Sequence, residues 1–380
     1  MNILITGSKG FIGRNLVAQL SNIKDGKCKV EGVPTGLTIF EYDVDADPAS
    51  LDRYCKEADF VFHLAGVNRP KNQSEFMEGN FGFTSVLLDT LKKHRNTCPI
   101  ALASSIQAAL DNPYGVSKKA GEDLLFKYAE ETSAKVYVYR FPNVFGKWCR
   151  PNYNSAVATF CHNIAHDLPI QVNDRSAKLT LVYIDDVVNE LISALVGKPN
   201  VVGKFCKVPI EHQITLGEIV DLIYSFRESR KNLQVPDMGN EFIKKLYATY
   251  LSYLPENGFS YPLKMNIDNR GSFTEFLKSP DRGQVSVNIS KPGITKGNHW
   301  HHTKNEKFLV VSGKGVIRFR KVGEEKVYEY YVSGEKLEVV DIPVGYTHNI
   351  ENLGDTDMVT IMWASEEFDK DKPDTYFDKV

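Results

Sequence analysis

Short apolar runs alternate with amphipathic stretches over roughly the first 250 residues of the chain. The apolar runs are rich in β-branched and aromatic side chains, which is typical of buried strands. We expect strands at Ile3–Thr6, Thr38–Tyr42, Phe60–Leu64, Ile100–Ser104 and Val136–Arg140. Helical spacing of apolar residues between them predicts helices at Phe11–Leu20, Phe83–Lys93 and Lys118–Thr132. This alternation predicts a doubly wound, Rossmann-like α/β fold, with a parallel sheet and helices on both faces.

The pattern changes close to residue 255. A last amphipathic helix is predicted at Glu241–Leu251, and Leu254–Gly258 then interrupts the helical spacing with a proline and a glycine. Beyond this break, short alternating runs are separated by glycine and proline turns, and we expect strands at Gln284–Ile289, Lys307–Val311, Gly315–Arg320, Val327–Val332 and Met358–Trp363. Closely spaced short strands predict an all-β jelly-roll barrel. The predicted domains are therefore residues 1–250 and 255–380, with the boundary within 245–257.

Composition narrows the class of protein without identifying it. A length of 380 residues predicts two or three domains, and 42% hydrophobic with 25% charged residues is ordinary for a globular protein. The net charge of -2 argues against a nucleic-acid partner, which a basic surface would indicate. No apolar run approaches the ~20 residues of a membrane span, and the first apolar stretch is too short for a signal peptide. The six cysteines are scattered, as expected of reduced thiols, so we expect a cytoplasmic protein.

The first predicted strand runs directly into a glycine-rich loop, Thr6–Gly13, with glycines at the spacing G-x-x-G-x-x-G. Between a strand and a helix, such glycines permit a tight turn, a close approach of the backbone to a pyrophosphate, and close packing of the helix on the sheet. The N-terminus of the helix then faces the anion. We therefore predict dinucleotide binding, with contacts from Gly7, Ser8, Lys9, Gly10, Phe11, Ile12 and Gly13.

Two residues bear on which dinucleotide binds. Lys9, just before the second glycine, favours NADP because its ammonium group can pair with a 2′-phosphate. Asp43, which follows the strand Thr38–Tyr42, favours NAD because its carboxylate can accept a hydrogen bond from a free ribose hydroxyl. We expect NADP(H), and NAD stays open as the alternative.

A second group of residues suits proton transfer to a carbonyl oxygen. Tyr114 and Lys118 lie four positions apart, on one face of a helix. The ammonium group lowers the pKa of the phenol and can hold a nicotinamide ribose, while the tyrosine gives or takes the proton. Ser104 and Ser105 end a predicted strand just upstream, where a hydroxyl can hydrogen-bond to that oxygen. Each feature is common by itself on protein surfaces, and it is their order after a glycine loop that indicates a site.

Together these motifs resemble the extended short-chain dehydrogenase/reductase family, which acts on nucleotide sugars. The resemblance covers residues 1–250 and rests on Thr6–Gly13, His63–Gly66, Asn80, Ser104–Ser105, Tyr114 with Lys118, Arg140–Gly146 and Tyr183–Asp186. It implies that Ser105, Tyr114 and Lys118 form a catalytic triad. It also implies cofactor contacts from Leu64, Ala65 and Lys118, and a contact to the substrate diphosphate from Asn143. Asp185 and Asp186 are expected to cap a helix.

The second predicted domain contains a pattern of metal-ligand residues. His299 and His301, two positions apart, project to the same face of a strand. Glu306 follows one short turn later, and His348 can come from a neighbouring strand. Three imidazoles and one carboxylate suit Zn²⁺, Fe²⁺, Mn²⁺ or Ni²⁺ and leave positions open for water or substrate. We predict one bound divalent metal, with Zn²⁺ as the first expectation, while His302 points to the opposite face.

This spacing resembles the two motifs of the cupins, over residues 255–380. In addition, Asp268–Glu275 resembles the entrance arm of the nucleotide-linked 4-keto-sugar 3,5-epimerases. That resemblance implies that Arg270 meets the nucleotide diphosphate, and the alternative is that Arg270 is a surface loop residue. Barrels of the cupin type commonly pair across a sheet edge, so we expect a homodimer through residues 255–380.

A hydride-transfer domain combined with a metal-binding cupin resembles the bifunctional enzymes of capsular-polysaccharide synthesis. The resemblance implies a UDP-4-keto-6-deoxy-N-acetylhexosamine substrate, on the way to UDP-N-acetyl-L-fucosamine. The cupin would epimerise carbon 3, and the first domain would reduce the carbon 4 ketone with NADPH. The base for epimerisation stays open among His302, Lys304 and Tyr346. Two alternatives also stay open: a reductase whose cupin only binds substrate or supports the structure, and an NAD(P)-sensing binding module.

Overall fold

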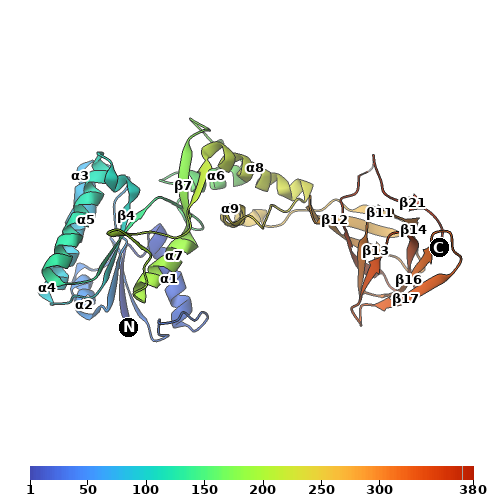
Figure 1. Cartoon of the computed structure of the whole chain (residues 1–380), viewed down its shortest axis with the longest axis horizontal. Coiled ribbons are helices and arrows are strands. Elements are labelled where there is room, and N and C mark those ends of the chain that lie inside the picture. Colours follow the sequence, from blue (N-terminus) through green and yellow to red (C-terminus); the bar gives the residue numbers. More distant parts are fainter. Residues whose placement is uncertain (370) are drawn as a thin grey trace. The chain divides into compact units, whose positions relative to one another are not determined.

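The computed structural model describes residues 1–369 and 371–380. The chain divides into two compact units (Figure 1). The first unit comprises Met1–Tyr224 and Lys245–Leu254, and the second comprises Ser225–Lys244 and Pro255–Val380. Helices α8 (Leu216–Asn232) and α9 (Glu241–Leu251) are therefore divided between the two units. The domain limits 1–250 and 255–380 stay a prediction.

A seven-stranded sheet forms the centre of the first unit. Its order is β2-β1-β3-β4-β5-β9-β8, and all neighbours are parallel except β8 and β9. The strands are β1 (Asn2–Thr6), β2 (Thr38–Tyr42), β3 (Phe60–His63), β4 (Ile100–Ser105), β5 (Val136–Phe141), β8 (Val201–Val202) and β9 (Phe205–Cys206). All five predicted strands are present, each within one residue of its predicted ends. The chain passes from β1 to β2 on one side and then to β3 on the other, so β1 and β3 flank the switch point at which such folds bind ligands.

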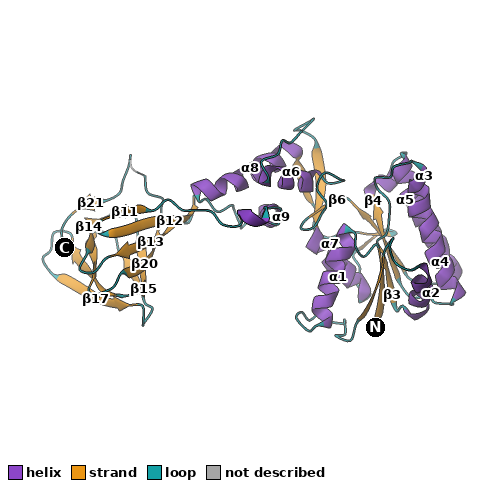
Figure 2. Ribbon diagram, turned by 180° about the vertical axis from the view of Figure 1, so that it is seen from behind, coloured by secondary structure: helices purple, strands orange, loops and turns teal. Residues whose placement is uncertain are grey.

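Helices cover both faces of this sheet because its central strands are apolar on both sides. Ile3 and Ile5 of β1 belong to one buried cluster and Leu4 to another on the opposite face. The helices are α1 (Phe11–Lys24), α2 (Pro48–Glu57), α3 (Ser74–Met77), α4 (Phe83–Lys93), α5 (Pro113–Thr132), α6 (Ala156–Ala165) and α7 (Ile184–Leu195). Figure 2 shows α1 and α7 on one side of the sheet and α2, α4 and α5 on the other. The predicted Rossmann-like fold is confirmed, and in the described part of the chain no helix combines the length and apolar character that a membrane span requires.

Helix α5 begins at Pro113, five residues before its predicted start. Asn112 occupies the N-cap position, and its side chain accepts a hydrogen bond from the backbone N–H of Gly115 at 2.8 Å. Proline is favourable in the first helical turn, because the N–H group that it lacks would have no partner there. The proline therefore begins the helix that carries Tyr114 and Lys118.

A smaller sheet of order β10-β7-β6 completes the first unit, with β6 (Asn143–Phe145), β7 (Lys178–Tyr183) and β10 (His212–Thr215). Helix α7 follows β7 directly. The expectation that Asp185 and Asp186 cap a helix is wrong, because Tyr183 occupies the N-cap position of α7. Both carboxylates lie instead in the first turn, where the helix dipole favours negative charge, and they pair with Lys147 and Lys245.

Two antiparallel sheets form the body of the second unit, in the orders β11-β12-β13-β20-β15-β18 and β17-β16-β19-β14-β21. The strands are β11 (Asn266–Asp268), β12 (Gly271–Ser279), β13 (Gly283–Ser290), β14 (Thr295–Trp300), β15 (Glu306–Ser312), β16 (Lys314–Lys321), β17 (Val327–Ser333), β18 (Val339–Ile342), β19 (Tyr346–Asn352), β20 (Met358–Ala364) and β21 (Tyr376–Phe377). Phe308 of β15 packs with Ile317 of β16 and Ile350 of β19 in a core between the sheets. The predicted all-β cupin-type fold is confirmed.

Candidate functional site

The glycine loop joins β1 to α1 at the switch point of the first unit. Gly7 has a φ angle of +70°, and a Cβ atom there would lie 2.6 Å from the backbone nitrogen of Ala65. At Gly13, a Cβ atom would lie 2.1 Å from the carbonyl oxygen of Gly7. Neither position accepts a larger residue. The predicted loop Gly7–Gly13 and the predicted contacts Leu64 and Ala65 therefore lie directly against each other.

The start of α1 fits the anion expected of a dinucleotide. Its N-cap residue, Gly10, has no side chain that could satisfy the first backbone N–H groups, and the first turn contains no acidic residue. The hydroxyl group of Ser8 is buried and has no hydrogen-bond partner among the described residues. Unsatisfied donors at a helix N-terminus attract phosphate groups. These residues therefore fit a pyrophosphate.

Lys9 and Asp43, the two residues that bear on the choice of dinucleotide, are neighbours. The backbone N–H of Lys9 donates to Oδ2 of Asp43 at 2.8 Å, and the backbone N–H of Val44 donates to Oδ1 at 2.9 Å. The ammonium group of Lys9 pairs with Asp45, and this hydrogen bond raises the pKa of Lys9. Both carboxylate oxygens of Asp43 thus accept hydrogen bonds from backbone N–H groups. The Lys9 ammonium group is exposed, and its partner Asp45 was not predicted from the sequence.

Ser105, Tyr114 and Lys118 are brought together at the end of β4. Burial raises the pKa of the Tyr114 phenol, and a hydrogen bond with Ser105 acts in the opposite direction. The ammonium group of Lys118 donates to the carbonyl oxygen of Ala103 at 2.9 Å. Burial lowers the pKa of Lys118 to about 8. A half-buried phenol that is hydrogen-bonded to a hydroxyl group can give a proton to a carbonyl oxygen at neutral pH.

Asn80 fixes the loop after β3 against the helix that carries Tyr114 and Lys118. Its Oδ1 accepts from the backbone N–H of Val67 at 3.0 Å, and its Nδ2 donates to the Val67 carbonyl at 2.9 Å and to Oγ of Ser117 at 3.0 Å. Asn80 lies in a π-helical turn, Glu78–Gly82, a feature that recurs at functional sites. The fit is so close that a Cβ atom at Gly66 would lie 3.0 Å from Nζ of Lys118.

A buried ion pair that the sequence analysis missed lies beside Lys118. Glu122, one helical turn further along α5, is 1% exposed. Arg140, near the end of β5, donates to its two oxygens at 2.6 and 2.9 Å, and the hydroxyl of Ser104 donates to Oε1. The charge of Glu122 raises the pKa of Lys118 against the larger effect of burial. Local spacing could not reveal this ion pair, because Glu122 lies on α5 and Arg140 lies on β5.

His63 connects the glycine loop to Asn80. Its Nδ1 lies 2.7 Å from Oγ1 of Thr6, and its Nε2 lies 2.9 Å from Oγ1 of Thr84. Thr84 donates its hydroxyl proton to the carbonyl oxygen of Asn80 at 2.6 Å, so Nε2 must be the donor to Thr84 and Nδ1 the acceptor from Thr6. Burial lowers the pKa of His63 to about 3, and the charge of Lys118 acts in the same direction. His63 is therefore a neutral structural connector.

Asn143, which was expected to meet the substrate diphosphate, lies on β6 and is exposed. Its Nδ2 donates to the carbonyl oxygen of Thr180 at the long distance of 3.5 Å. Among the described residues, no hydrogen bond joins this side chain to the triad. Its role stays a prediction.

In the second unit, the four predicted metal ligands converge. His299 of β14 lies opposite His348 of β19, and Glu306 begins β15. One ligand atom from each of these residues and from His301 lies within 4.8 Å of the others. Two ligands that each bind one ion at about 2.1 Å can be at most about 4.2 Å apart. A contraction of about half an ångström therefore brings the four side chains within reach of one ion.

The chemistry of these side chains fits a divalent cation. Nε2 of His301, both ring nitrogens of His348 and Oε2 of Glu306 are buried without a hydrogen-bond partner among the described residues. Burial lowers the pKa of His299 to about 4, which keeps this imidazole neutral, as a metal ligand must be. Burial acts to raise the pKa of Glu306, but the neighbouring His301 and His348 lower it. A cation would satisfy all of these atoms at once.

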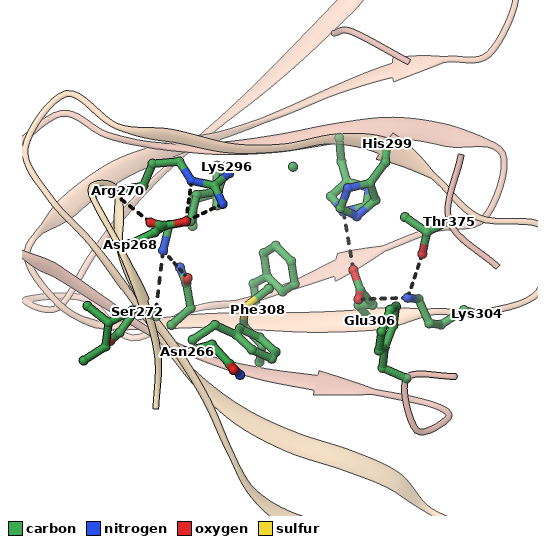
Figure 3. A pocket seen from close by; sticks show the side chains of 18 residues that line it. Asn266, Asp268, Arg270, Ser272, Lys296, His299, Lys304, Glu306, Phe308 and Thr375 are labelled. Atoms are coloured by element: carbon green, nitrogen blue, oxygen red, sulfur yellow. Dashed lines mark hydrogen bonds and ion pairs between the residues drawn. The ribbon is translucent and has the colours of Figure 1, made fainter. Parts of the chain in front are cut away.

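The cluster lies at one end of a cavity of about 550 Å³, and Arg270 and Lys296 lie at the other end (Figure 3). Asp268 accepts hydrogen bonds from Nε and Nη2 of Arg270 at 3.0 and 2.7 Å. Lys296 donates to Oδ1 of Asn288 and to the carbonyl oxygen of Ile289, each at 2.8 Å. Arg270 thus lines the same cavity as the predicted metal ligands, and Lys296 adds a cation that the sequence analysis missed.

The three candidate bases occupy different places. Lys304 lines the cavity, and its Nζ lies 3.9 Å from Oε1 of Glu306 and 3.2 Å from Oγ1 of Thr375. His302 packs against aromatic rings, and Tyr346 packs against the apolar core. Neither His302 nor Tyr346 is among the described residues that line the cavity.

Two protein families match the chain, one in its N-terminal part and the other in its C-terminal part. Residues 3–203 match the NAD dependent epimerase/dehydratase family, and residues 266–376 match the polysaccharide biosynthesis C-terminal domain. A UDP-2-acetamido-2,6-beta-L-arabino-hexul-4-ose reductase of Pseudomonas aeruginosa is 45% identical over 377 residues, which are 99% of this chain and 98% of the relative.

Solved structures extend the similarity over the full length. The crystal structure of the capsular polysaccharide assembling protein CapF from Staphylococcus aureus is 59% identical, with a TM-score of 0.93 and coverage of 100% of both chains. The expected resemblance to a protein of capsular-polysaccharide synthesis is thereby confirmed. A UDP-glucose 4-epimerase of Thermotoga maritima, at 21% identity, a TM-score of 0.53 and 67% of this chain, shares the fold alone.

We predict that the purified protein binds one divalent metal ion per chain. His348→Ala should weaken Zn²⁺ binding by more than about 100-fold, because loss of a ligand costs more than loss of an outer hydrogen-bond partner. Elemental analysis and Zn²⁺ titration against a chromophoric chelator measure both quantities. His302→Ala, outside the cavity, is the control and should bind Zn²⁺ like the wild type. A wild-type protein with no affinity for Zn²⁺, Fe²⁺, Mn²⁺ or Ni²⁺ contradicts this assignment.

Proposed function

Because the chain belongs to the NAD-dependent epimerase/dehydratase family, we propose that it converts a UDP-4-keto-6-deoxy-N-acetylhexosamine in two steps. The second unit epimerises carbon 3, and the first unit reduces the carbon 4 ketone with NADPH, in the synthesis of a capsular-polysaccharide precursor related to UDP-N-acetyl-L-fucosamine. Two observations carry the proposal. In the first unit, Ser105, Tyr114 and Lys118 lie near the end of β4. In the second unit, the ligand atoms of His299, His301, Glu306 and His348 converge beside a cavity. The similarity to a hexulose reductase and to CapF supports the same reading.

Reduction in the first unit is a proton transfer coupled to hydride delivery. The reduced nicotinamide, when bound, supplies the hydride. The hydroxyl of Ser105 hydrogen-bonds to the ketone oxygen and orients it, and the Tyr114 phenol gives that oxygen its proton. The phenolate that remains is stabilised by the positive charge of Lys118, which lies on the same face of α5.

Epimerisation in the second unit begins with removal of the proton on carbon 3, which the carbon 4 ketone acidifies. A divalent cation bound by His299, His301, Glu306 and His348 would supply a Lewis acid for the ketone oxygen. Lys304 is the candidate base that the cavity favours, because it lines the cavity beside Glu306. Return of the proton to the opposite face of the ring inverts carbon 3.

The opposite end of the cavity suits the nucleotide diphosphate. Arg270 and Lys296 together carry two positive charges, and Asp268 offsets one of them. An incoming phosphate group can replace Asp268 on the guanidinium group, since both present the paired oxygens that arginine prefers. The sugar ring then extends toward the predicted metal ligands.

We favour NADP(H) over NAD for the first unit. Each carboxylate oxygen of Asp43 already accepts one backbone N–H, which leaves it fewer lone pairs for a ribose hydroxyl. The exposed ammonium group of Lys9 can exchange Asp45 for a 2′-phosphate. We favour Zn²⁺ for the second unit, since imidazole and carboxylate ligands suit it.

We further propose a homodimer through the second unit. Strand β17 lies at the edge of its sheet, and Tyr328, Tyr330 and Tyr331 on this strand are exposed. Aromatic residues are enriched at protein interfaces, and an open strand edge is a surface that pairing covers.

Incubation of the 4-keto sugar with the protein in D₂O, without nicotinamide cofactor, should place deuterium at carbon 3. Epimerisation needs no hydride, so mass spectrometry of the recovered sugar tests the second unit alone. Lys304→Gln should slow the exchange by about 10²–10⁴-fold, the usual contribution of a general base, whereas the control His302→Gln should not. Absence of deuterium with the wild type would instead favour a reductase whose cupin only binds substrate.

Tyr114→Phe should slow reduction of the 4-keto sugar by about 10²–10⁴-fold, because the proton donor is lost. Oxidation of NADPH, followed by absorbance, measures this rate. Exchange of the proton at carbon 3 should continue in this variant, since it takes place in the other unit. Tyr261→Phe, at an exposed tyrosine of the second unit, is the control. Full reduction by Tyr114→Phe would rule out the triad.

The rate of reduction should fall as the pH rises through about 8, because Lys118 loses its proton there. Glu122→Gln should move this fall to lower pH, since the negative charge that raises the pKa of Lys118 is removed. His63 is neutral throughout this range and does not contribute. Glu130→Gln, at an exposed position of the same helix, is the control. An unchanged pH profile in Glu122→Gln contradicts the electrostatic role of the ion pair.

A further inference from the structure

The segment Asp374–Val380 is tied to the strands that carry the predicted metal ligands. Within β21, Phe377 lies opposite His299 of β14. The backbone N–H of Asp378 donates to the carbonyl oxygen of Asn298 at 3.0 Å, and the carboxylate of Asp378 pairs with Arg320 at 2.9 Å. The hydroxyl of Thr347, next to His348, donates to the carbonyl oxygen of Asp378. The segment is thus held by contacts with β14, β16 and β19.

Asp374 makes the contact that bears on the ligands themselves. Its carbonyl oxygen accepts a hydrogen bond from Nδ1 of His301, a side chain that is 1% exposed. A carbonyl oxygen can only accept, so the proton of the neutral ring must reside on Nδ1. Nε2 is then left without a proton and faces Oε2 of Glu306 at 3.4 Å. This is the ring state in which Nε2 can bind a metal ion.

The carboxylate of Asp374 holds that carbonyl in place. Oδ1 accepts from the backbone N–H of His302 at 2.9 Å. Oδ2 accepts from the backbone N–H groups of Thr303 at 2.7 Å and Lys304 at 2.9 Å, and from the Thr303 hydroxyl at 3.0 Å. Four donors from the turn between His301 and Glu306 therefore converge on one side chain. The next residue, Thr375, accepts from Nζ of Lys304 at 3.2 Å.

We propose that Asp374 is a positioning residue of the metal site: its side chain orders the turn that joins His301 to Glu306, and its carbonyl sets the tautomer and direction of the His301 ring. The inference rests on the metal site put forward above. Asp374 thereby takes part in building the metal site, although it lies far from the histidine motif in the sequence. Through Thr375, the same segment also sets the position of Nζ of Lys304 in the cavity.

The test is the affinity for Zn²⁺ alone, measured by competition with a chromophoric chelator. Asp374→Ala should bind Zn²⁺ about 10–100-fold more weakly than the wild type, because the carbonyl oxygen that orients His301 loses the four hydrogen bonds that hold it, and a displaced outer partner costs about as much as a lost one. Asp374→Asn should lie between them, since an amide oxygen still accepts some of the four bonds. Asp371→Ala, which removes the same charge three positions earlier at an exposed site, should bind like the wild type.

A second measurement covers a possible folding defect of Asp374→Ala. NMR of the ring nitrogens in histidine-labelled, metal-free protein should show a proton on Nδ1 of His301 in the wild type, and loss of that single tautomer in Asp374→Asn. The inference is overturned if both Asp374 variants bind Zn²⁺ within twofold of the wild type, or if the Nδ1 proton of His301 persists in them. A wild type that does not bind Zn²⁺ overturns the metal site itself, and that outcome is distinguished by the wild-type titration alone.

Discussion

Burying a polar atom without a partner costs free energy, and both candidate sites follow from how this cost is met. Beside the triad of the first unit it is met within the chain. The carboxylate of Glu122 is buried on α5, and Arg140 and Ser104 supply its hydrogen bonds from the ends of β5 and β4. Satisfying this one charge holds the helix of Tyr114 and Lys118 against the strand ends beside Ser105. The geometry of the triad therefore depends on an ion pair that takes no part in proton transfer.

In the second unit the same cost is left unmet at the predicted metal ligands. His301, His348 and Glu306 are surrounded by protein, yet the atoms that face one another lack hydrogen bonds among the described residues. The buried side chain of Asn352, by contrast, is satisfied by backbone carbonyls. The contrast is a physical argument for a cation, because three imidazoles and a carboxylate without one would be a net cost to folding. The cavity of about 550 Å³ opens directly beside these side chains.

The sequence was sufficient wherever function depends on local spacing. Consecutive apolar residues in β1, the glycines that follow it, and the short distance from His299 to Glu306 are all readable along the chain, and the folds that they predicted are confirmed. What the sequence could not provide are partners that meet only after folding. Arg140 of β5 reaches Glu122 of α5, and Lys296 of β14 reaches Asn288 of β13, which lies in the other sheet. The start of α5 was predicted five residues too late, although Asn112 and Pro113 are a favourable N-cap and first helical residue.

His301 and the carbonyl oxygen that directs its ring are 73 positions apart in the chain. A ribosome releases the chain from the N-terminal side onward, so all four predicted ligands emerge well before Asp374 does. The hydrogen bonds that fix the His301 ring and the turn after it therefore form only after almost the whole chain has been made. A metal ion held by these ligands would meet its ordered ligand set only at the end of synthesis.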